Sequence, residues 1–432
     1  MIDERFESLL TSVPGPQTAA LTPPLRRRES RNVTYFDETF PVFWESARDA
    51  IVVDVDGNRY LDLTAGFGVA NVGHANPRIA EAISTQAHRL MHAMGDVHPT
   101  HARTQLYDAL RPHVPSGLTK WFLATTGSEA VEAAMKTAML ATGKSIFVTY
   151  RNAYHGLSFG ALEVAGIEKF RTPFTPLLAR RALYLDYPRA GRDELGDALD
   201  RLDALLAARH DVAALIIEPI QGRGGCIVPP RGYLPALRAC CDAHGVLLIF
   251  DEIYTGFGRT GTWFAAADEG VVPDILCIGK AMGSGFPISA IVARAHVMDA
   301  WPESSGEAIH TSTFLGNPMG CAAAIATVRE MERLDLAARA RELGALLGRR
   351  LDALRAHASV LDVRGRGMMW GVQLRDGATT QRVVARALAR GVIVVPAGPL
   401  GDVVALTPPL VISEEQLHHA VDLLDAAIEE RG

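Results

Sequence analysis

Pro273-Asp274-Ile275-Leu276-Cys277-Ile278-Gly279-Lys280 is the stretch that decides the fold. An apolar run of strand length leads directly into Lys280, and lysine is rarely found at the end of a buried strand without a reason. A desolvated lysine has a lowered pKa and can form a Schiff base with an aldehyde. An isolated lysine in this position more often extends its ammonium group to the surface, so the interpretation needs support from other stretches.

Further apolar runs lie on the N-terminal side of this stretch, at 145–149, 213–217 and 246–250, and helical patterns at 129–142 and 233–244 lie between them. Strands that alternate with helices predict an α/β fold with a mainly parallel sheet covered on both faces.

The two ends of the chain differ from this middle part. Residues 1–40 contain several prolines and are expected to form an extended arm, and Asp56-Gly57 between two short apolar runs predicts a hairpin. From about residue 335, helical and strand patterns predict a smaller α+β unit that ends in a helix over 414–430. We therefore expect three parts: an arm with a hairpin that packs with the small domain (1–65), a large domain (66–330) and a small C-terminal domain (331–432).

Composition limits the partners and the location. The chain has 432 residues and a formal net charge of -6, which gives no electrostatic reason to expect nucleic acid or an anionic membrane as a partner. The five cysteines form no CxxC pair, no apolar stretch approaches the roughly 20 residues of a membrane helix, and Met1-Ile2-Asp3-Glu4-Arg5 does not resemble a signal peptide. We expect a cytoplasmic protein without a metal site.

Two more stretches carry chemical groups. Val246–Phe250 ends in Asp251 and Glu252, at the strand end that opens onto the ligand crevice of an α/β sheet. The alternative is a structural salt bridge or a helix cap. In Ala124–Ala130, small residues precede a helix, so that Gly127 and Ser128 could bind a phosphate at the helix start. Here the alternative is an ordinary cap.

Together, a phosphate site, a strand-end aspartate and a strand-end lysine meet the needs of pyridoxal 5′-phosphate (PLP). Asp251 would pair with the pyridine nitrogen and keep it protonated, so that the ring withdraws electrons. Lys280 would form the Schiff base and later move a proton between substrate and cofactor.

The motifs also resemble a known family. The chain is similar to class III (ω-type) aminotransferases of the PLP-dependent fold type I, and most similar to the putrescine, 4-aminobutyrate and acetylornithine/ornithine group. The resemblance extends from about residue 40 to 430. It is carried, in family order and spacing, by Thr126–Ala130, Tyr154-His155-Gly156, Glu218-Pro219-Ile220-Gln221-Gly222, Asp251-Glu252-Ile253, Gly256–Gly261, Gly279-Lys280 and Ser312–Pro318.

The resemblance implies a fold and roles for individual residues. The fold is a large domain with a mainly parallel, seven-stranded type of sheet and a smaller α+β domain. Tyr154 and Ile253 match the residues that cover the two faces of the PLP ring, and His155 and Glu218 match positions near the cofactor. Thr313 of the partner subunit matches a threonine that reaches the phosphate. A homodimer with shared active sites follows, possibly paired into a tetramer.

Departures from the family pattern bear on the substrate. Tyr254 stands where many relatives have a glutamine that contacts a cofactor oxygen. Ala405 stands where relatives that handle amino acids have an arginine for the α-carboxylate, and Arg223 replaces its paired glutamate. Leu157 replaces an arginine that some relatives use for a distal carboxylate. We hypothesise that Arg223 binds the carboxylate of the keto acid; the alternative is an exposed loop arginine.

The expected activity is transamination by a ping-pong scheme, from a primary amine, a polyamine or an amino sugar to pyruvate or 2-oxoglutarate. Phe67 matches a substrate-pocket position and resembles amine-accepting ω-transaminases, although a core phenylalanine is nearly as compatible. One alternative is a racemase, epimerase, aminomutase or decarboxylase on the same fold. A PLP-binding regulatory protein is a remote alternative, because the sequence contains no segment typical of an added DNA-binding domain.

Overall fold

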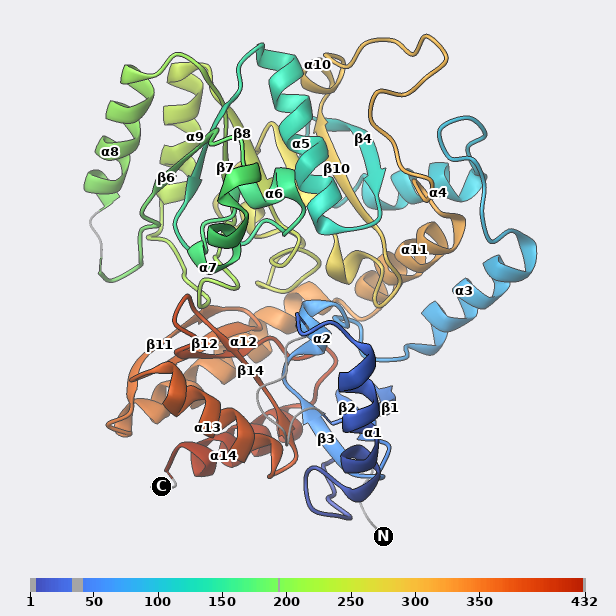
Figure 1. Ribbon diagram of the computed structural model, residues 1–432, viewed down its shortest axis with the longest axis vertical. Helices are drawn as coiled ribbons and strands as arrows, with labels where there is room; N and C mark the ends of the chain where they lie inside the picture. The colour runs from blue at the N-terminus through green and yellow to red at the C-terminus, as the bar shows by residue number, and fades with distance from the viewer. Residues whose placement is uncertain (1–4, 33–41, 193–194, 430–432) are drawn as a thin grey trace.

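The computed structural model describes residues 5–32, 42–192 and 195–429, and a seven-stranded sheet lies in its upper half as drawn in Figure 1. From β9 to β6 all neighbouring strands are parallel, whereas β10 is antiparallel to both of its neighbours. In order across the sheet the strands are β4 (Leu118–Ala124), β10 (Ser289–Arg294), β9 (Ile275–Ile278), β8 (Leu247–Asp251), β7 (Val212–Ile217), β5 (Ile146–Tyr150) and β6 (Ala182–Leu185). The predicted mainly parallel sheet is confirmed.

Helices cover both faces of this sheet. Successive residues of a strand point to opposite faces and pack in two different apolar clusters, each with its own helices. Ile249 packs in the cluster that contains Ala130 and Val131 of α5, whereas Leu248 and Phe250 belong to the cluster that contains α9. The helices of this part of the chain are α3 (Pro77–Arg89), α4 (His101–Leu110), α5 (Gly127–Thr142), α6 (Phe159–Val164), α7 (Glu168–Arg171), α8 (Leu195–Ala208), α9 (Tyr233–His244), α10 (Ala295–Met298) and α11 (Pro318–Arg333).

Two smaller sheets form the rest of the molecule. One is antiparallel and packs against α12 (Leu336–Asp352) and α13 (Gly377–Leu388), and both helices contact α14 (Glu414–Glu429). Its strands are β11 (Val360–Arg366), β12 (Met369–Leu374), β15 (Val403–Leu406) and β14 (Val395–Ala397). The other combines three strands from the first part of the chain with one from its last part, and both parts lie in the lower half of Figure 1. Its strands are β1 (Trp44–Arg48), β2 (Ile51–Asp54), β3 (Arg59–Asp62) and β13 (Val392–Ile393).

The expected extended arm over 1–40 is wrong for part of its length, because the helix α1 (Pro16–Arg28) lies there. Pro16 suits a first helical position, since its missing N–H would have no partner within the helix. The carboxylate of Asp56 accepts hydrogen bonds from the backbone N–H groups of Gln17 and Thr18, at 2.6 and 2.9 Å. This cap comes from the distant β2–β3 turn, so local sequence did not indicate it. The residues 1–4 and 33–41 of the arm lie outside the described residues.

The apolar run Val392–Val395 is divided between two sheets. Val392 and Ile393 pair with β3, whereas Val395 pairs with Ala405 of β15. The sequence does not indicate this division, because apolar content does not show a change of partner. The proposed boundary between residues 330 and 331 falls inside α11, which packs on α3 and α4.

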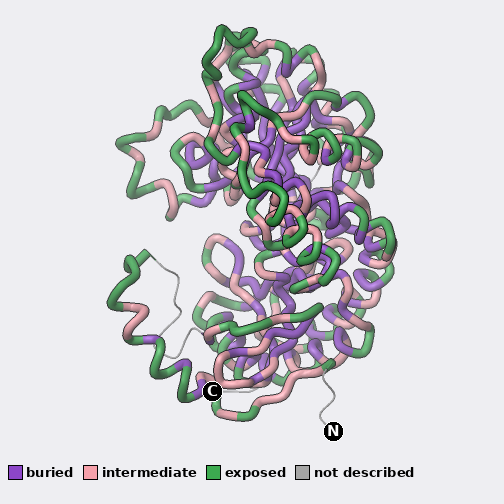
Figure 2. Tube along the Cα trace, turned by 90° about the vertical axis from the view of Figure 1, so that its right-hand side faces the viewer, coloured by how far each residue is buried: buried purple, intermediate pink, exposed green. Residues whose placement is uncertain are grey.

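A buried arginine ties the parts together. Arg259 is fully buried and donates hydrogen bonds to the carbonyl oxygens of Met368 and Pro408, and to the side chain of Asn71. The buried stretches of the trace run continuously through the middle of the molecule in Figure 2. None of the described helices is both long enough and apolar enough to cross a membrane.

Candidate active site

Asp251 and Lys280 meet at one edge of the large sheet. Asp251 is the last residue of β8, and Lys280 comes shortly after the end of β9. The strands β8 and β9 are parallel neighbours. The carboxyl ends of parallel strands lie at the same edge, so the two side chains reach one cavity of about 210 Å³. The cavity is lined by Thr126, Gly127, Ser128, Tyr154, His155, Gly156, Glu218, Arg223, Asp251, Ile253, Tyr254 and Lys280.

Lys280 is held in a position that favours its neutral form. Burial lowers the pKa of its amino group from 10.5 to about 8, although the negative charges of Asp251 and Glu218 act in the opposite direction. Its backbone has a φ of +44°, an uncommon conformation for a residue with a side chain. The Nζ atom lies 3.9 Å from the centroid of the Tyr254 ring. An amine with a pKa near neutrality is suited to attack a carbonyl group.

Asp251 is fixed by two hydrogen bonds. Its Oδ2 atom lies 2.7 Å from Nδ1 of the buried His155, and its Oδ1 atom accepts the backbone N–H of Ile253 at 3.1 Å. Glu252, the other carboxylate at this strand end, points elsewhere: it accepts the backbone N–H groups of Ala265 and Ala266. The structure thus separates a cavity carboxylate from a structural one, which the sequence did not do.

The start of α5 lines the same cavity with Thr126, Gly127 and Ser128. Thr126 and Glu129 form a capping box. The hydroxyl of Thr126 accepts the backbone N–H of Glu129, and the carboxylate of Glu129 accepts the backbone N–H of Thr126. The backbone of Gly127 lies close to Ile253, since a Cβ atom at Gly127 would be 3.0 Å from its side chain. The hydroxyl of Ser128 accepts the N–H of Leu157 at 3.2 Å, which leaves its own hydrogen for another acceptor.

Glu218 positions two segments of the cavity wall. Its carboxylate accepts the backbone N–H of Tyr154 at 2.9 Å and that of Gly222 at 3.1 Å. Burial raises the pKa of Glu218 to about 7, and the two backbone bonds oppose this shift. Tyr154 lies against Phe170 edge to face, with ring centroids 5.9 Å apart. Tyr154 and the Arg223 loop are therefore held by the same buried side chain.

Arg223 and Tyr254 occupy the side of the cavity next to the small domain. Nη1 of Arg223 donates to the carbonyl oxygen of Pro396 at 3.0 Å. The hydroxyl of Tyr254 lies 3.1 Å from Oγ1 of Thr407, a pairing that the sequence did not predict. Ala405 is buried in an apolar cluster with Ile220, Cys226, Met369, Ala397 and Val403. Arg223 is thus a cavity residue rather than an exposed loop arginine, and Ala405 brings no charge to this side.

Four predicted residues do not line the cavity: Ala405, which is buried as described above, and Phe67, Leu157 and Thr313. Phe67, in α2 (Ala65–Gly68), is 56% exposed, so it is not a core phenylalanine, and Leu157 is 46% exposed. Thr313 is also exposed. By contrast, Thr126 and Gly156 line the cavity. The sequence places both residues in family motifs, but no role was predicted for either.

The residues present fit PLP. One cavity brings together the N-terminal end of a helix, a buried carboxylate at a strand end and a primary amine with a lowered pKa. Tyr154 and Ile253 add an aromatic and an aliphatic side chain to the same walls. These are the groups required by a phosphate, a pyridine nitrogen, an aldehyde and a flat ring.

The family model "Aminotransferase class-III" matches residues 34–428. The chain belongs to the class III aminotransferases. It is 39% identical to an acetylornithine aminotransferase of Methanosarcina mazei over 387 residues, which cover 90% of this chain and 92% of the relative. It is also 38% identical to a 4-aminobutyrate aminotransferase of Mycobacterium tuberculosis over 451 residues, with 98% of each chain covered.

A solved structure agrees with this assignment. An amine transaminase from an uncultivated Pseudomonas species, in its PLP-bound form, superposes with a TM-score of 0.86 at 30% identity and covers 93% of this chain and 98% of that one. The class III aminotransferase described here is therefore a PLP-dependent enzyme of the predicted fold. The relatives favour transamination over the racemase, aminomutase and regulatory alternatives.

Proposed function

We propose that this aminotransferase moves an amino group from a primary amine or an ω-amino compound to a keto acid, pyruvate or 2-oxoglutarate. The observation that carries the proposal is the placement of Arg223 in the cavity while Ala405 is buried among apolar side chains. One guanidinium group can bind an acceptor carboxylate in a bidentate way. Position 405 is an alanine, so it provides no positive charge that would select a donor with an α-carboxylate. The named substrates of the two curated relatives, acetylornithine and 4-aminobutyrate, are consistent with ω-amino donors.

The proposed transamination assigns a separate role to each group of cavity residues. Bound PLP supplies an electron-withdrawing ring next to the carbon that carries the transferred amino group. Lys280 holds the cofactor and then moves a proton with its Nζ atom. Asp251, oriented by His155, supports the proton on the ring nitrogen. Gly127 and Ser128 bind the phosphate with backbone and hydroxyl donors.

The remaining cavity residues position these groups. Tyr154 and Ile253 cover the two ring faces, and Glu218 holds Tyr154 and the Arg223 loop by their backbone N–H groups. Tyr254 lies beside Lys280 and is tied by its hydroxyl to Thr407. Phe67 and Leu157 are assigned to the entrance of the substrate pocket, where their exposed apolar side chains would favour a hydrophobic portion of the donor.

We further propose a homodimer in which Thr313 reaches the phosphate site of the neighbouring chain. Thr313 is exposed and lies outside the cavity of its own chain, and exposed apolar side chains flank it in sequence and in space. They include Ile309 and Phe314, and the Phe314 ring packs against His92 of a segment that exposes Met91, Met94 and Val97. Such a patch is typical of a subunit interface. Pairing of two such dimers through further exposed apolar side chains would give a tetramer. A cytoplasmic location is proposed from the five free thiols.

A half-reaction tests the proposed function. PLP-loaded protein given a diamine or 4-aminobutyrate alone should lose its visible absorbance once and then stop, and pyruvate or 2-oxoglutarate should restore it. Amino acids that carry only an α-amino group should be poorer donors. Continuous turnover without any keto acid would contradict the proposal, as would a strict preference for α-amino acids. Sedimentation velocity tests the dimer, with Thr313→Ala expected to weaken PLP retention without changing the sedimentation coefficient.

A further inference from the structure

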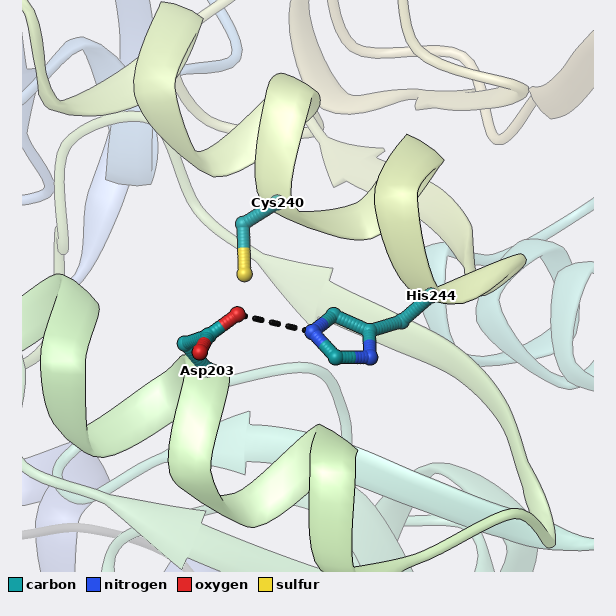
Figure 3. Close-up of side chains that lie close together, drawn as sticks. All are labelled: Asp203, Cys240 and His244. Carbon is teal, nitrogen blue, oxygen red and sulfur yellow. Dashed lines mark hydrogen bonds and ion pairs between the residues drawn. The ribbon is translucent and has the colours of Figure 1, made fainter.

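Three side chains of metal-binding types converge on the outer helices of the large domain, away from the residues of the catalytic cavity. Cys240 and His244 lie one turn apart on α9, and Asp203 faces them from α8. The Sγ atom, the ring nitrogen and the carboxylate oxygen all lie within 4.8 Å of one another. Figure 3 shows the three side chains pointing to one spot between the helices, with His244 Nε2 hydrogen-bonded to Asp203 Oδ1 at 2.8 Å.

The combination of ligands indicates a particular class of ion. A thiolate and an imidazole suit zinc rather than magnesium or calcium, and a carboxylate is a common third ligand. Residues at positions i and i+4 of a helix project from the same face, so Cys240 and His244 can bind one ion without any change in the backbone. Zinc bonds to such ligands are roughly 2.0–2.3 Å long, so ligand atoms within 4.8 Å of one another need only small side-chain movements to share an ion.

The site is accessible from solvent. Asp203 is exposed, and Cys240 and His244 are partly exposed. Among the five cysteines, all of which belong to the described residues, Cys240 is the one that is not buried. Neither cofactor binding nor the proposed proton transfer uses any of these three side chains.

We propose that Asp203, Cys240 and His244 bind a zinc-class divalent cation that links α8 to α9. On binding, the Cys240 thiol loses its proton to solvent and the hydrogen bond between His244 and Asp203 is replaced by bonds to the ion. Three protein ligands leave a fourth position for water. Because only Gly245 and Val246 separate α9 from β8, the ion would fix the helix that precedes the Asp251 strand.

Metal titration of the PLP-loaded protein after treatment with a chelator tests the site. Calorimetry with Zn²⁺ should give one ion per chain, and Co²⁺ should give the intense visible and near-ultraviolet bands of a tetrahedral thiolate complex. Cys240→Ser, His244→Asn and Asp203→Asn should each weaken binding, the first two at least ten-fold. Asp200→Asn, an exposed change on the same helix as Asp203, is the matched control and should bind as the wild type does. Equal affinity in the wild type and Cys240→Ser, or a cobalt spectrum without a thiolate band, would overturn the proposal.

Thiol reactivity gives an independent readout that does not depend on activity. In the folded protein, a thiol reagent should modify one cysteine rapidly, and this reaction should disappear in Cys240→Ser. Zn²⁺ should slow the modification of the wild type and raise its melting temperature, with no such rise in Cys240→Ser. If Zn²⁺ changes neither quantity in the wild type, the three side chains form only a hydrogen-bonded cluster and the proposal fails.

Discussion

The amino nitrogen of Lys280 lies 3.9 Å from the centre of the Tyr254 ring, and the ring is anchored by the contact of its hydroxyl with Thr407. An aromatic face attracts an ammonium group, whereas burial favours the neutral amine. Burial outweighs the negative charges of Asp251 and Glu218, which act in the opposite direction, and the pKa of Lys280 is lowered to about 8. This balance sets the pH range in which the lysine can react.

The first prediction concerns that pH range. The rate at which the cofactor-free protein combines with PLP should rise with pH and reach half of its maximum near 8, because only the neutral amine attacks the aldehyde. Stopped-flow absorbance measures this rate. Tyr254→Phe retains the ring and should leave the midpoint unchanged. A midpoint near 10.5, the ordinary value for lysine, would contradict the lowered pKa.

The same shift affects stability. Between about 8 and 10.5 the unfolded chain binds more protons at Lys280 than the folded chain does, so the free energy of unfolding of the cofactor-free protein should rise with pH. Lys280→Met should lack this contribution. Urea unfolding of both proteins across this range isolates it, and parallel pH profiles would show that the lysine does not titrate in this way.

The charge of Asp251 should matter more than its shape. Asp251→Asn retains the size of the side chain and a hydrogen bond to His155 but removes the negative charge beside the ring nitrogen. We expect kcat to fall by roughly 10²-fold or more while PLP still binds. Steady-state kinetics and absorbance spectra of the loaded protein check both parts. Asp299→Asn, a change of the same kind at an exposed position, should have no effect.

Arg223 should determine the affinity for the acceptor. Arg223→Ala should raise KM for pyruvate and 2-oxoglutarate by roughly 10- to 100-fold, the loss of about 1.5–3 kcal/mol from hydrogen bonds to a charged group. Arg223→Lys should recover part of this loss, because lysine retains the charge without the bidentate geometry. KM for an amine donor without a carboxylate should not change. An unaltered KM for both keto acids would show that Arg223 does not bind them.

Arg259 should contribute to the stability of the whole molecule. Its guanidinium group is buried and serves three acceptors on three separate segments, Asn71, Met368 and Pro408. Arg259→Met would leave these acceptors without a donor, and we expect a loss of about 3 kcal/mol or more in the free energy of unfolding. Urea unfolding compares this variant with Arg375→Met, which is exposed and should be within about 0.5 kcal/mol of the wild type.

Much of the large domain could be predicted because its information is local. The four adjacent strands β9, β8, β7 and β5 are apolar runs, and their alternation with helices fixes the type of sheet. The strand β4, with the exposed Thr119 and Lys120, has no such pattern and was not predicted. Asp251 and Lys280 were recognised because they come at the ends of apolar runs. The cap of α1 by Asp56, the contact of Tyr254 with Thr407 and the division of Val392–Val395 could not be predicted. In each case the partner is far away in the sequence, and residue type alone does not identify it.

The pairing of β13 with β3 also has a consequence for synthesis of the protein. When β3 leaves the ribosome, its hydrogen-bonding partner Val392–Ile393 has not yet been translated, so one edge of the N-terminal hairpin stays open for most of the synthesis of the chain. Completion of this sheet must wait until nearly the whole sequence has emerged, and such long-range pairing is slow to form. A nascent chain that stalls before residue 392 would expose that edge to other chains.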